Sequence, residues 1–224
     1  LAREFLARGE RVLITTTTRI AREEAADAAL EGRGAQFLFS GLTPDGRKLT
    51  GIRPDLVNAL RRSGEFDRIL VEADGSARRP LKASAPHEPV IPSATDVLVA
   101  IAGLNGLGLP LQETNVFRAE IWAQLSGRRL GSPVDVESIA RMAAHASGFF
   151  KGCPPGAKQV LFLNQADTPE RLAAAIQIFE LLASSRNRAP VRVALGCLLP
   201  TPRIAGGAQL PAAESGHPQP LLLD

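Results

Sequence analysis

Short apolar runs alternate with amphipathic segments along most of the chain. The runs rich in Val, Ile, Leu and Phe predict strands at residues 12–16, 36–39, 68–73, 97–102, 159–164 and 191–195. Apolar residues at helical spacing predict helices at residues 1–8, 22–30, 54–62, 113–125, 136–147 and 169–184. This alternation is typical of an α/β protein with a mostly parallel sheet.

Three of the apolar runs, at residues 68–73, 97–102 and 159–164, lack the period-two alternation of a half-exposed strand. Continuous apolar strands are typical of a parallel sheet that is covered on both faces. The sequence therefore predicts a three-layer α/β fold. We expect a single domain over residues 1–204 and a flexible tail, rich in proline and glycine, over residues 205–224.

The composition narrows the class of protein. Of the 224 residues, 45% are hydrophobic and 22% are charged, as in globular proteins, and no apolar run approaches the ~20 residues of a membrane helix. The net charge of +3 comes from scattered arginines, and no Tyr and one Trp are present, which gives little support to a nucleic-acid surface. The two distant cysteines predict neither a disulfide framework nor a zinc site. We expect a soluble cytoplasmic protein that binds neither nucleic acid nor membrane.

A metal and phosphate site is predicted where the third strand ends. Glu72, Asp74 and Gly75 follow that strand, and the cations Arg78 and Lys82 come next. Carboxylates hold Mg²⁺ directly or through water, and a glycine lets the backbone approach a phosphate, whose remaining charge the cations would meet. A half-buried strand followed by an ordinary polar loop would explain the same residues.

Two other strand ends carry candidate residues, at the positions where parallel sheets bind ligands. The hydroxyls of Thr16 and Thr17 can coordinate a metal or bind phosphate, although β-branched threonines also simply favour strands. Asn164 and Asp167 follow a later strand, and an aspartate there can accept both N–H donors on the edge of a guanine. Capping of the next helix, which opens with Pro169, is the alternative.

These segments resemble nucleotide-binding families. Asn164-Gln165-Ala166-Asp167 is similar to the Asn-Lys-x-Asp guanine-recognition motif of GTPases, with glutamine in place of lysine. VEADG resembles the strand-end Glu-x-x-Gly of the GTPase-like metal chaperones that mature urease and hydrogenase, and the related element of dethiobiotin synthetase. VLITTTTRI, KLTGI, VEADGSARRPLKASAPHEPVIP, VAIAGLNGLGLPL and GFFKGCPPGAKQVLFLNQAD follow the order and spacing of the YqeC family. The resemblance to that family covers the region from Leu1 to Asp167.

The YqeC resemblance implies a P-loop NTPase-like fold and a role in selenium cofactor biosynthesis, as an accessory protein of selenium-dependent molybdenum hydroxylases. Members of that family begin with a Gly-rich P-loop, but no G-x-x-x-x-G-K-[ST] occurs in these 224 residues. We therefore expect that this chain lacks the N-terminal strand and P-loop of the fold. LAREFLARGERVLITTTT would then be the second half of the helix that follows the P-loop, together with the next strand.

The resemblance implies a Mg²⁺-dependent nucleoside triphosphatase that uses GTP or ATP. It would act as a maturation factor for a selenium- or molybdenum-cofactor-dependent hydroxylase, with that hydroxylase or its cofactor precursor as partner. Glu72 and Asp74 are the expected metal ligands. The same two residues and Lys82 are the expected catalytic residues. The expected nucleotide contacts are Thr16, Thr17, Gly75, Asn164 and Asp167. The expected substrate loop contains Arg78, His87 and Glu88.

Two other functions remain open. One is a non-hydrolytic carrier or scaffold that holds a cofactor precursor or a partner enzyme. The other is a small-molecule kinase or ligase that resembles dethiobiotin synthetase.

Overall fold

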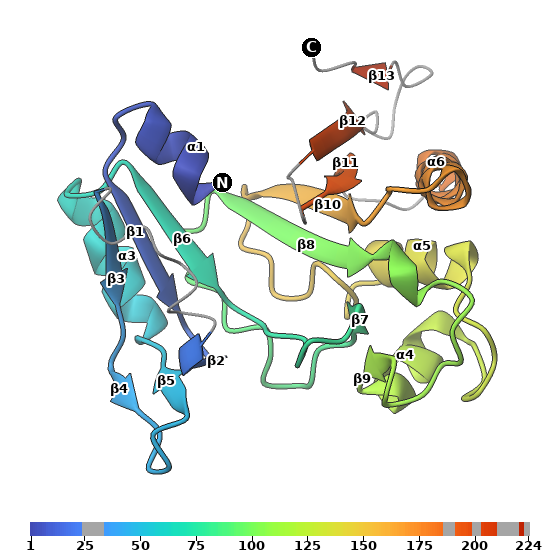
Figure 1. Cartoon of the computed structure of the whole chain (residues 1–224), viewed down its shortest axis with the longest axis horizontal. Coiled ribbons are helices and arrows are strands. Elements are labelled where there is room, and N and C mark those ends of the chain that lie inside the picture. The colour runs from blue at the N-terminus through green and yellow to red at the C-terminus, as the bar shows by residue number, and fades with distance from the viewer. Residues whose placement is uncertain (24–33, 186–190, 199–202, 210–219, 222–224) are drawn as a thin grey trace. The chain divides into compact units, whose positions relative to one another are not determined.

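The computed structural model describes residues 1–23, 34–185, 191–198, 203–209 and 220–221 (Figure 1). These residues belong to two units, each with its own sheets. Unit 1 comprises Leu1–Gly75 and His87–Thr95, and unit 2 comprises Ser76–Pro86 and Asp96–Asp224. Most of the helix expected at residues 22–30 lies outside the described residues.

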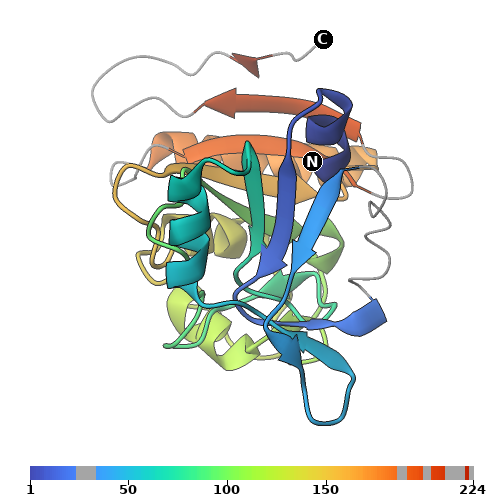
Figure 2. The ribbon, with the colours of Figure 1, turned by 90° about the vertical axis from the view of Figure 1, so that its left-hand side faces the viewer.

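Unit 1 is built on a parallel sheet in the strand order β3–β1–β6, whose strands lie side by side in Figure 2. Its main elements are α1 (Ala2–Ala7), β1 (Val12–Thr16), β3 (Ala35–Leu38), α3 (Pro54–Ser63) and β6 (Arg68–Glu72). The parallel register sets Thr16 opposite Glu72. The polar carboxyl ends of β1 and β6 therefore lie next to each other.

A small antiparallel sheet, in the order β2–β5–β4, also belongs to unit 1. Its strands are β2 (Arg19–Ala21), β4 (Gly41–Leu42) and β5 (Lys48–Thr50). After β5 the chain returns to the end of β1, where the N–H of Gly51 donates to the carbonyl of Thr18 at 2.7 Å and the N–H of Ile52 donates to the carbonyl of Thr16 at 2.9 Å. These bonds fix the position of the threonine run.

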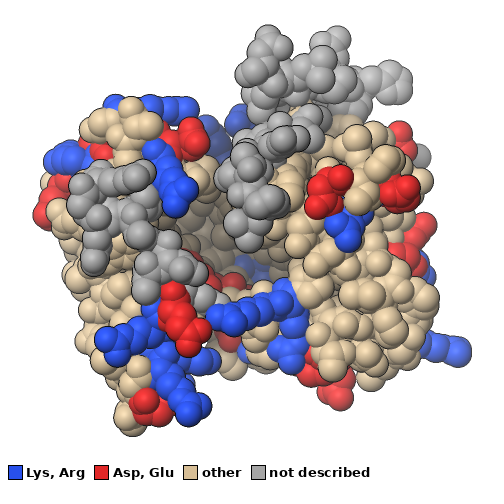
Figure 3. Space-filling view, viewed as in Figure 1, with Lys and Arg blue, Asp and Glu red and all other residues tan. Residues whose placement is uncertain are grey.

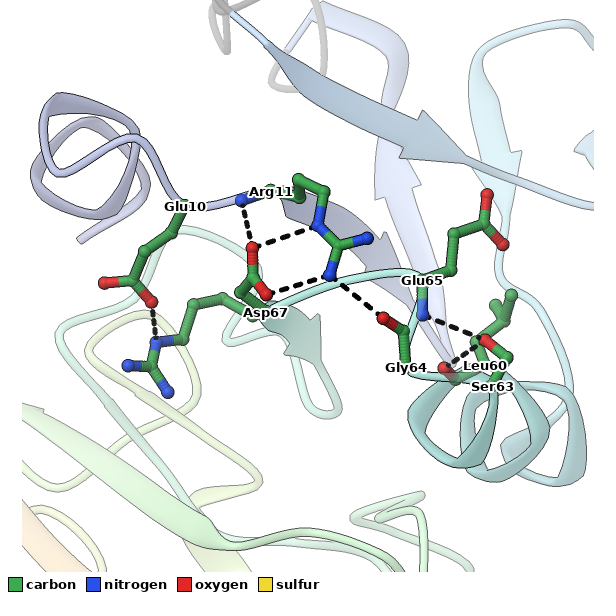
Figure 4. A network of polar contacts seen from close by, with 8 residues as sticks. Glu10, Arg11, Leu60, Ser63, Gly64, Glu65 and Asp67 are labelled. Carbon is green, nitrogen blue, oxygen red and sulfur yellow. Dashed lines mark hydrogen bonds and ion pairs between the residues drawn. The ribbon is translucent and has the colours of Figure 1, made fainter.

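The opposite ends of β1 and β6 are joined by an ion pair. The guanidinium of Arg11 donates to both carboxylate oxygens of Asp67, at 3.1 and 2.9 Å, and also to the carbonyl of Gly64 at 3.0 Å (Figure 4). The hydrogen bonds from the Arg11 side chain and N–H lower the pKa of Asp67 to about 2. Gly64 ends α3 with a φ of 70°, a left-handed conformation that glycine adopts without strain.

Unit 2 contains a five-stranded sheet in the order β13–β12–β11–β10–β8. β8, β10 and β11 are parallel, whereas β12 and β13 join antiparallel. Its elements are β7 (Leu81–Lys82), β8 (Val97–Gly103), the 3₁₀ helix η1 (Leu104–Gly106), β9 (Val116–Phe117), α4 (Ala119–Ser126), α5 (Val136–Ala144), β10 (Lys158–Asn164), α6 (Pro169–Ser184), β11 (Val191–Cys197), β12 (Arg203–Gln209) and β13 (Pro220–Leu221). Trp122, Ile139, Leu161, Leu163 and Ile178 are fully buried in its core.

The observed elements confirm an α/β architecture with mostly parallel sheets. The finer prediction of a P-loop NTPase-like fold stays a prediction, as does the division into a domain and a tail at residue 204, which β12 crosses. The prediction that the run at residues 97–102 is buried on both faces is wrong. Val97, Val99 and Ile101 alternate along β8 and are 47%, 41% and 58% exposed, so one face of this edge strand is open.

The helix expected at residues 113–125 begins only at Ala119. Residues 116–117 pair with β7 instead, and Arg118 adopts a left-handed conformation with a φ of 61°. A helix cannot pass through such a residue, so α4 starts after it.

No helix among the described residues has the length and apolar character needed to span a bilayer. On the face drawn in Figure 3, Lys and Arg side chains lie interspersed with Asp and Glu side chains and with uncharged residues. The scattered arginines of the sequence thus contribute to a surface of mixed charge on that face.

Candidate functional site

The predicted site residues are divided between the two units. The residues in unit 1 are Thr16, Thr17, Glu72, Asp74, Gly75, His87 and Glu88. The residues in unit 2 are Arg78, Lys82, Asn164 and Asp167.

In unit 1 the structure brings the ends of β1 and β6 together. The hydroxyl of Thr16 donates to the carbonyl of Glu72 at 2.9 Å, and the N–H of Thr17 donates to the same carbonyl at 3.0 Å. Oε2 of Glu72 is buried, and its Oε1 lies over Gly75, where an added Cβ would be 3.2 Å away. The absence of a side chain at Gly75 therefore lets the Glu72 carboxylate approach the backbone of the loop.

The hydrogen bonds of the threonines limit what each hydroxyl can do. Thr16 is only 1% exposed, and its oxygen also accepts from the N–H of Thr18 at 3.0 Å, so this side chain holds the two strand ends together. The hydroxyl of Thr17 donates to the carbonyl of Val90 at 2.6 Å. A hydroxyl has one proton and two lone pairs, so Thr17 can still offer an oxygen to a cation.

The expected substrate-loop residues of unit 1 lie close to the same edge. The N–H of Val90 donates to the carbonyl of Ala73 at 3.2 Å, which anchors the segment after Glu88 beside the end of β6. The side chain of His87 is 78% exposed, and its Nε2 is 3.8 Å from Oε1 of Glu88. Glu88 is the more buried of the two, with a side-chain exposure of 17%.

The donor set at this edge suits a hard cation. In the part of the chain that the structure describes, no three His, Cys, Asp or Glu side chains gather into a ready-made metal site. Glu72 provides a carboxylate at this edge and Thr17 a hydroxyl oxygen, and Asp74 follows the end of β6 by two residues. Mg²⁺ in proteins is commonly held by one or two carboxylates together with phosphates and water, so the oxygen donors at this edge are of the type that Mg²⁺ prefers.

In unit 2, Asn164 ties neighbouring strands together at the carboxyl end of the sheet. Its Oδ1 accepts from the N–H of Gln165 at 2.9 Å and from the N–H of Leu198, which follows β11, at 3.2 Å. Gln165 has a φ of 64°, and its Oε1 would lie 3.0 Å from a Cβ added at Gly103, the last residue of β8. The ends of β8 and β10 therefore present polar side chains side by side.

Asp167 is engaged in an ion pair. Its Oδ1 accepts from the guanidinium of Arg171 at 2.7 Å, one turn further along α6. The cap of α6 is Thr168, whose side chain accepts from the N–H of Arg171 at 3.3 Å. The capping role that was the alternative for Asp167 thus belongs to the next residue, Thr168.

A cleft of about 520 Å³ opens within unit 2 between η1 and the first turns of α5 and α6. Leu104, Leu107 and Val136 are among its apolar lining, whereas Asn105 and Arg171 are among its polar lining. Its size lies in the range of small-molecule sites, and it lies at the carboxyl ends of parallel strands. This cleft could not be predicted from the sequence, because its lining comes from three distant segments.

Lys82, predicted to act in catalysis, lies over the ring of Phe117 in unit 2, with Nζ 5.1 Å from the ring centroid. Arg79 and Arg118 lie over the same ring. Phe117 and Arg118 could not be predicted as site residues, since only the pairing of β7 with β9 brings them to Lys82.

A family model and a protein of known sequence are similar to this chain. A family model described as "YqeC protein" matches residues 1–120, a segment that contains all of unit 1. The chain is also 31% identical over 194 residues to the "Uncharacterized protein YqeC" of Escherichia coli (strain K12), a match that covers 81% of this chain and 76% of that protein. No solved structure shows significant similarity to the chain.

Proposed function

The chain belongs to the YqeC family, and from this premise we propose that it binds a nucleoside triphosphate with Mg²⁺ and hydrolyses it. We further propose that this activity serves the maturation of a selenium- or molybdenum-cofactor-dependent hydroxylase. One observation carries the proposal. At the carboxyl edge of the unit 1 sheet, the carboxylate of Glu72 lies over Gly75 while the end of β1 is bonded to the end of β6.

Each residue at this edge has a proposed role. Glu72 and Asp74 would hold the cation directly or through water, and Thr17 can offer a further oxygen. The absence of a side chain at Gly75 lets the Glu72 carboxylate lie against the backbone of the loop, so a phosphate would reach this loop together with Mg²⁺. Thr16 would act indirectly, because its hydroxyl fixes the distance between β1 and β6.

The residues at this edge would orient and activate a water molecule for attack on the phosphate. When bound, Mg²⁺ would neutralise negative charge on the phosphates. A carboxylate beside it, Glu72 or Asp74, would orient a water molecule and accept its proton, which is general base catalysis. Asn164 and Asp167 belong to unit 2, and their contacts to a nucleotide base stay a prediction from the sequence.

The test is hydrolysis with a parallel binding titration in Glu72→Gln and Asp74→Asn. Both substitutions keep the shape of the side chain and remove its charge. We expect kcat to fall by roughly 100-fold, the usual scale for losing a positioned acid-base or electrostatic group. Nucleotide affinity should fall as well, because the bound Mg²⁺ would link these carboxylates to the phosphates.

Glu65→Gln is the matched control, since Glu65 is an exposed carboxylate of the same unit. It should leave hydrolysis unchanged. The enzyme proposal fails if the parent protein shows no Mg²⁺-dependent turnover, or if Glu72→Gln and Asp74→Asn both hydrolyse at the parental rate. Nucleotide binding without turnover would then favour the carrier or scaffold function.

A further inference from the structure

Three cationic side chains gather around the ring of Phe117 in unit 2. The pairing of β7 with β9 sets Lys82 opposite Phe117. Cζ of Arg79 lies 5.0 Å, Nζ of Lys82 lies 5.1 Å and Cζ of Arg118 lies 4.5 Å from the ring centroid. All three distances lie within the range of cation–π interactions, so the ring holds the three charges in one place.

The two segments that form this cluster carry more positive than negative charge. Residues 76–86 contain three cations and no acid, and residues 113–120 contain one cation and two acids. Because the three cations share one ring, any two of them lie no more than about 10 Å apart, which is close to the Debye length at 0.1 M salt. Like charges at this separation repel, and a bound anion would offset that repulsion.

The cluster already stabilises one negative charge of the protein itself. Oε1 of Glu113 is 3.9 Å from Nη2 of Arg79, and its Oε2 accepts from the N–H of Ala119 at 3.1 Å. Burial raises the pKa of Glu113, but the N–H groups of Arg118 and Ala119 and the charges of Arg79 and Arg118 outweigh it and hold the pKa below its usual value. The surroundings of Phe117 therefore favour an anion.

A cleft of about 800 Å³ shares Arg118 with the cluster, and its lining also includes Glu113, Ala119 and Glu120. This volume is sufficient for a small organic molecule. The guanidinium groups offer forks of N–H donors that match the oxygens of a phosphate group.

We propose that Arg79, Lys82 and Arg118, held around Phe117, form a binding site for the phosphate group of a small molecule whose remainder occupies the adjoining cleft. The site lies within unit 2, and its binding of phosphate does not depend on nucleotide hydrolysis at Glu72 and Asp74.

The first test is calorimetric titration of the whole chain with inorganic pyrophosphate, without divalent metal and at low salt. Arg79→Gln should raise the dissociation constant by about 10-fold or more, the scale of a lost charge-assisted hydrogen bond. Arg129→Gln removes the same charge from an exposed arginine of unit 2 that is not one of the three cations at the ring. It should change the dissociation constant by less than about twofold.

A second variant should strengthen pyrophosphate binding instead of weakening it, so its result does not depend on how well Arg79→Gln folds. Glu113→Gln keeps an oxygen that can accept from Ala119 but removes the competing charge, so pyrophosphate should bind about threefold or more tightly. Glu180→Gln, an exposed carboxylate on α6, should leave the affinity unchanged.

Three results would overturn the proposal. The first is an absence of saturable pyrophosphate binding by the parent chain. The second is equal weakening by Arg79→Gln and Arg129→Gln, or no tightening by Glu113→Gln, because binding would then reflect only general surface charge. The third is binding of citrate as tight as that of pyrophosphate, which would make the cluster a carboxylate site.

Discussion

Gly51 provides a direct test of the packing that supports the edge of unit 1. A Cβ added at this position would collide with the carbonyl oxygen of Thr16 and would lie only 2.7 Å from the carbonyl carbons of Thr16 and Thr17. All these atoms belong to the backbone, so no side-chain rotation relieves the contact. Either the end of β1 or the segment after β5 must move to accommodate the substitution Gly51→Ala.

The expected cost follows from two opposing effects. Overpacking against atoms that cannot rotate away costs about 1–3 kcal/mol. The smaller conformational entropy of alanine in the unfolded chain returns about 0.4–1 kcal/mol of stability. We therefore expect Gly51→Ala to lower the free energy of unfolding of unit 1 by roughly 1–2 kcal/mol. The same displacement would move Thr17, so Mg²⁺-dependent turnover should fall as well.

Urea denaturation followed by circular dichroism measures the effect, with Gly41→Ala as the matched control. Gly41 lies in β4 of the same unit, and its added Cβ would meet only Oγ1 of Thr50 at 3.6 Å, an ordinary contact. The control should change stability by less than about 0.5 kcal/mol. If Gly51→Ala is as stable as Gly41→Ala, the close approach of Gly51 to β1 is not a constraint and the reasoning is refuted.

Three further predictions concern pH, base selectivity and metal. The pKa of Asp67 is depressed from 3.8 to about 2 by Arg11, so its contribution to stability is complete above pH 3.8 and is lost as pH falls through 2. Urea unfolding between pH 4 and 2 should therefore show a smaller loss of stability in Asp67→Asn than in the parent, and identical pH profiles would contradict this. If Asp167 accepts from guanine, Asp167→Asn should shift binding from GTP toward xanthosine triphosphate in competition titrations. Equal affinities of the parent protein for GTP, ATP and xanthosine triphosphate would argue against the guanine contact. Chelation of Mg²⁺ should abolish nucleotide binding that depends on Glu72 but leave pyrophosphate binding at Phe117 intact. An equal loss of both would show that the two ligands do not bind at separate sites.

The elements with strong local signals could be predicted from the sequence. β1 and α6 have the bounds that the hydrophobic pattern predicts, because an apolar run and a Thr168-Pro169 start define them locally. Short strands such as β2, β4, β5, β7 and β9 were not predicted, since strand pairing rather than local composition produces them. The late start of α4 likewise follows from the left-handed Arg118, which no periodicity reveals.

The same distinction applies to the candidate sites. Glu72, Asp74 and Gly75 are neighbours in sequence, so their combination is visible in the amino-acid sequence alone. Arg79 and Arg118 are far apart in sequence and meet only through the pairing of β7 with β9, so their common contact with Phe117 could not be predicted. A combination of neighbouring residues can therefore be recognised in the sequence, whereas a contact made by the pairing of two short strands cannot.

The two proposed sites differ in what they offer to a phosphate group, whose oxygens only accept hydrogen bonds. At the edge of unit 1 the hydroxyl protons of Thr16 and Thr17 already go to backbone carbonyls, and the carboxylates of Glu72 and Asp74 repel an anion. A phosphate can approach those carboxylates only if a cation lies between them, which makes metal a requirement of that site. The cluster at Phe117 offers guanidinium and ammonium donors directly, so it needs no metal. Metal dependence is therefore the property by which binding at one site can be told from binding at the other.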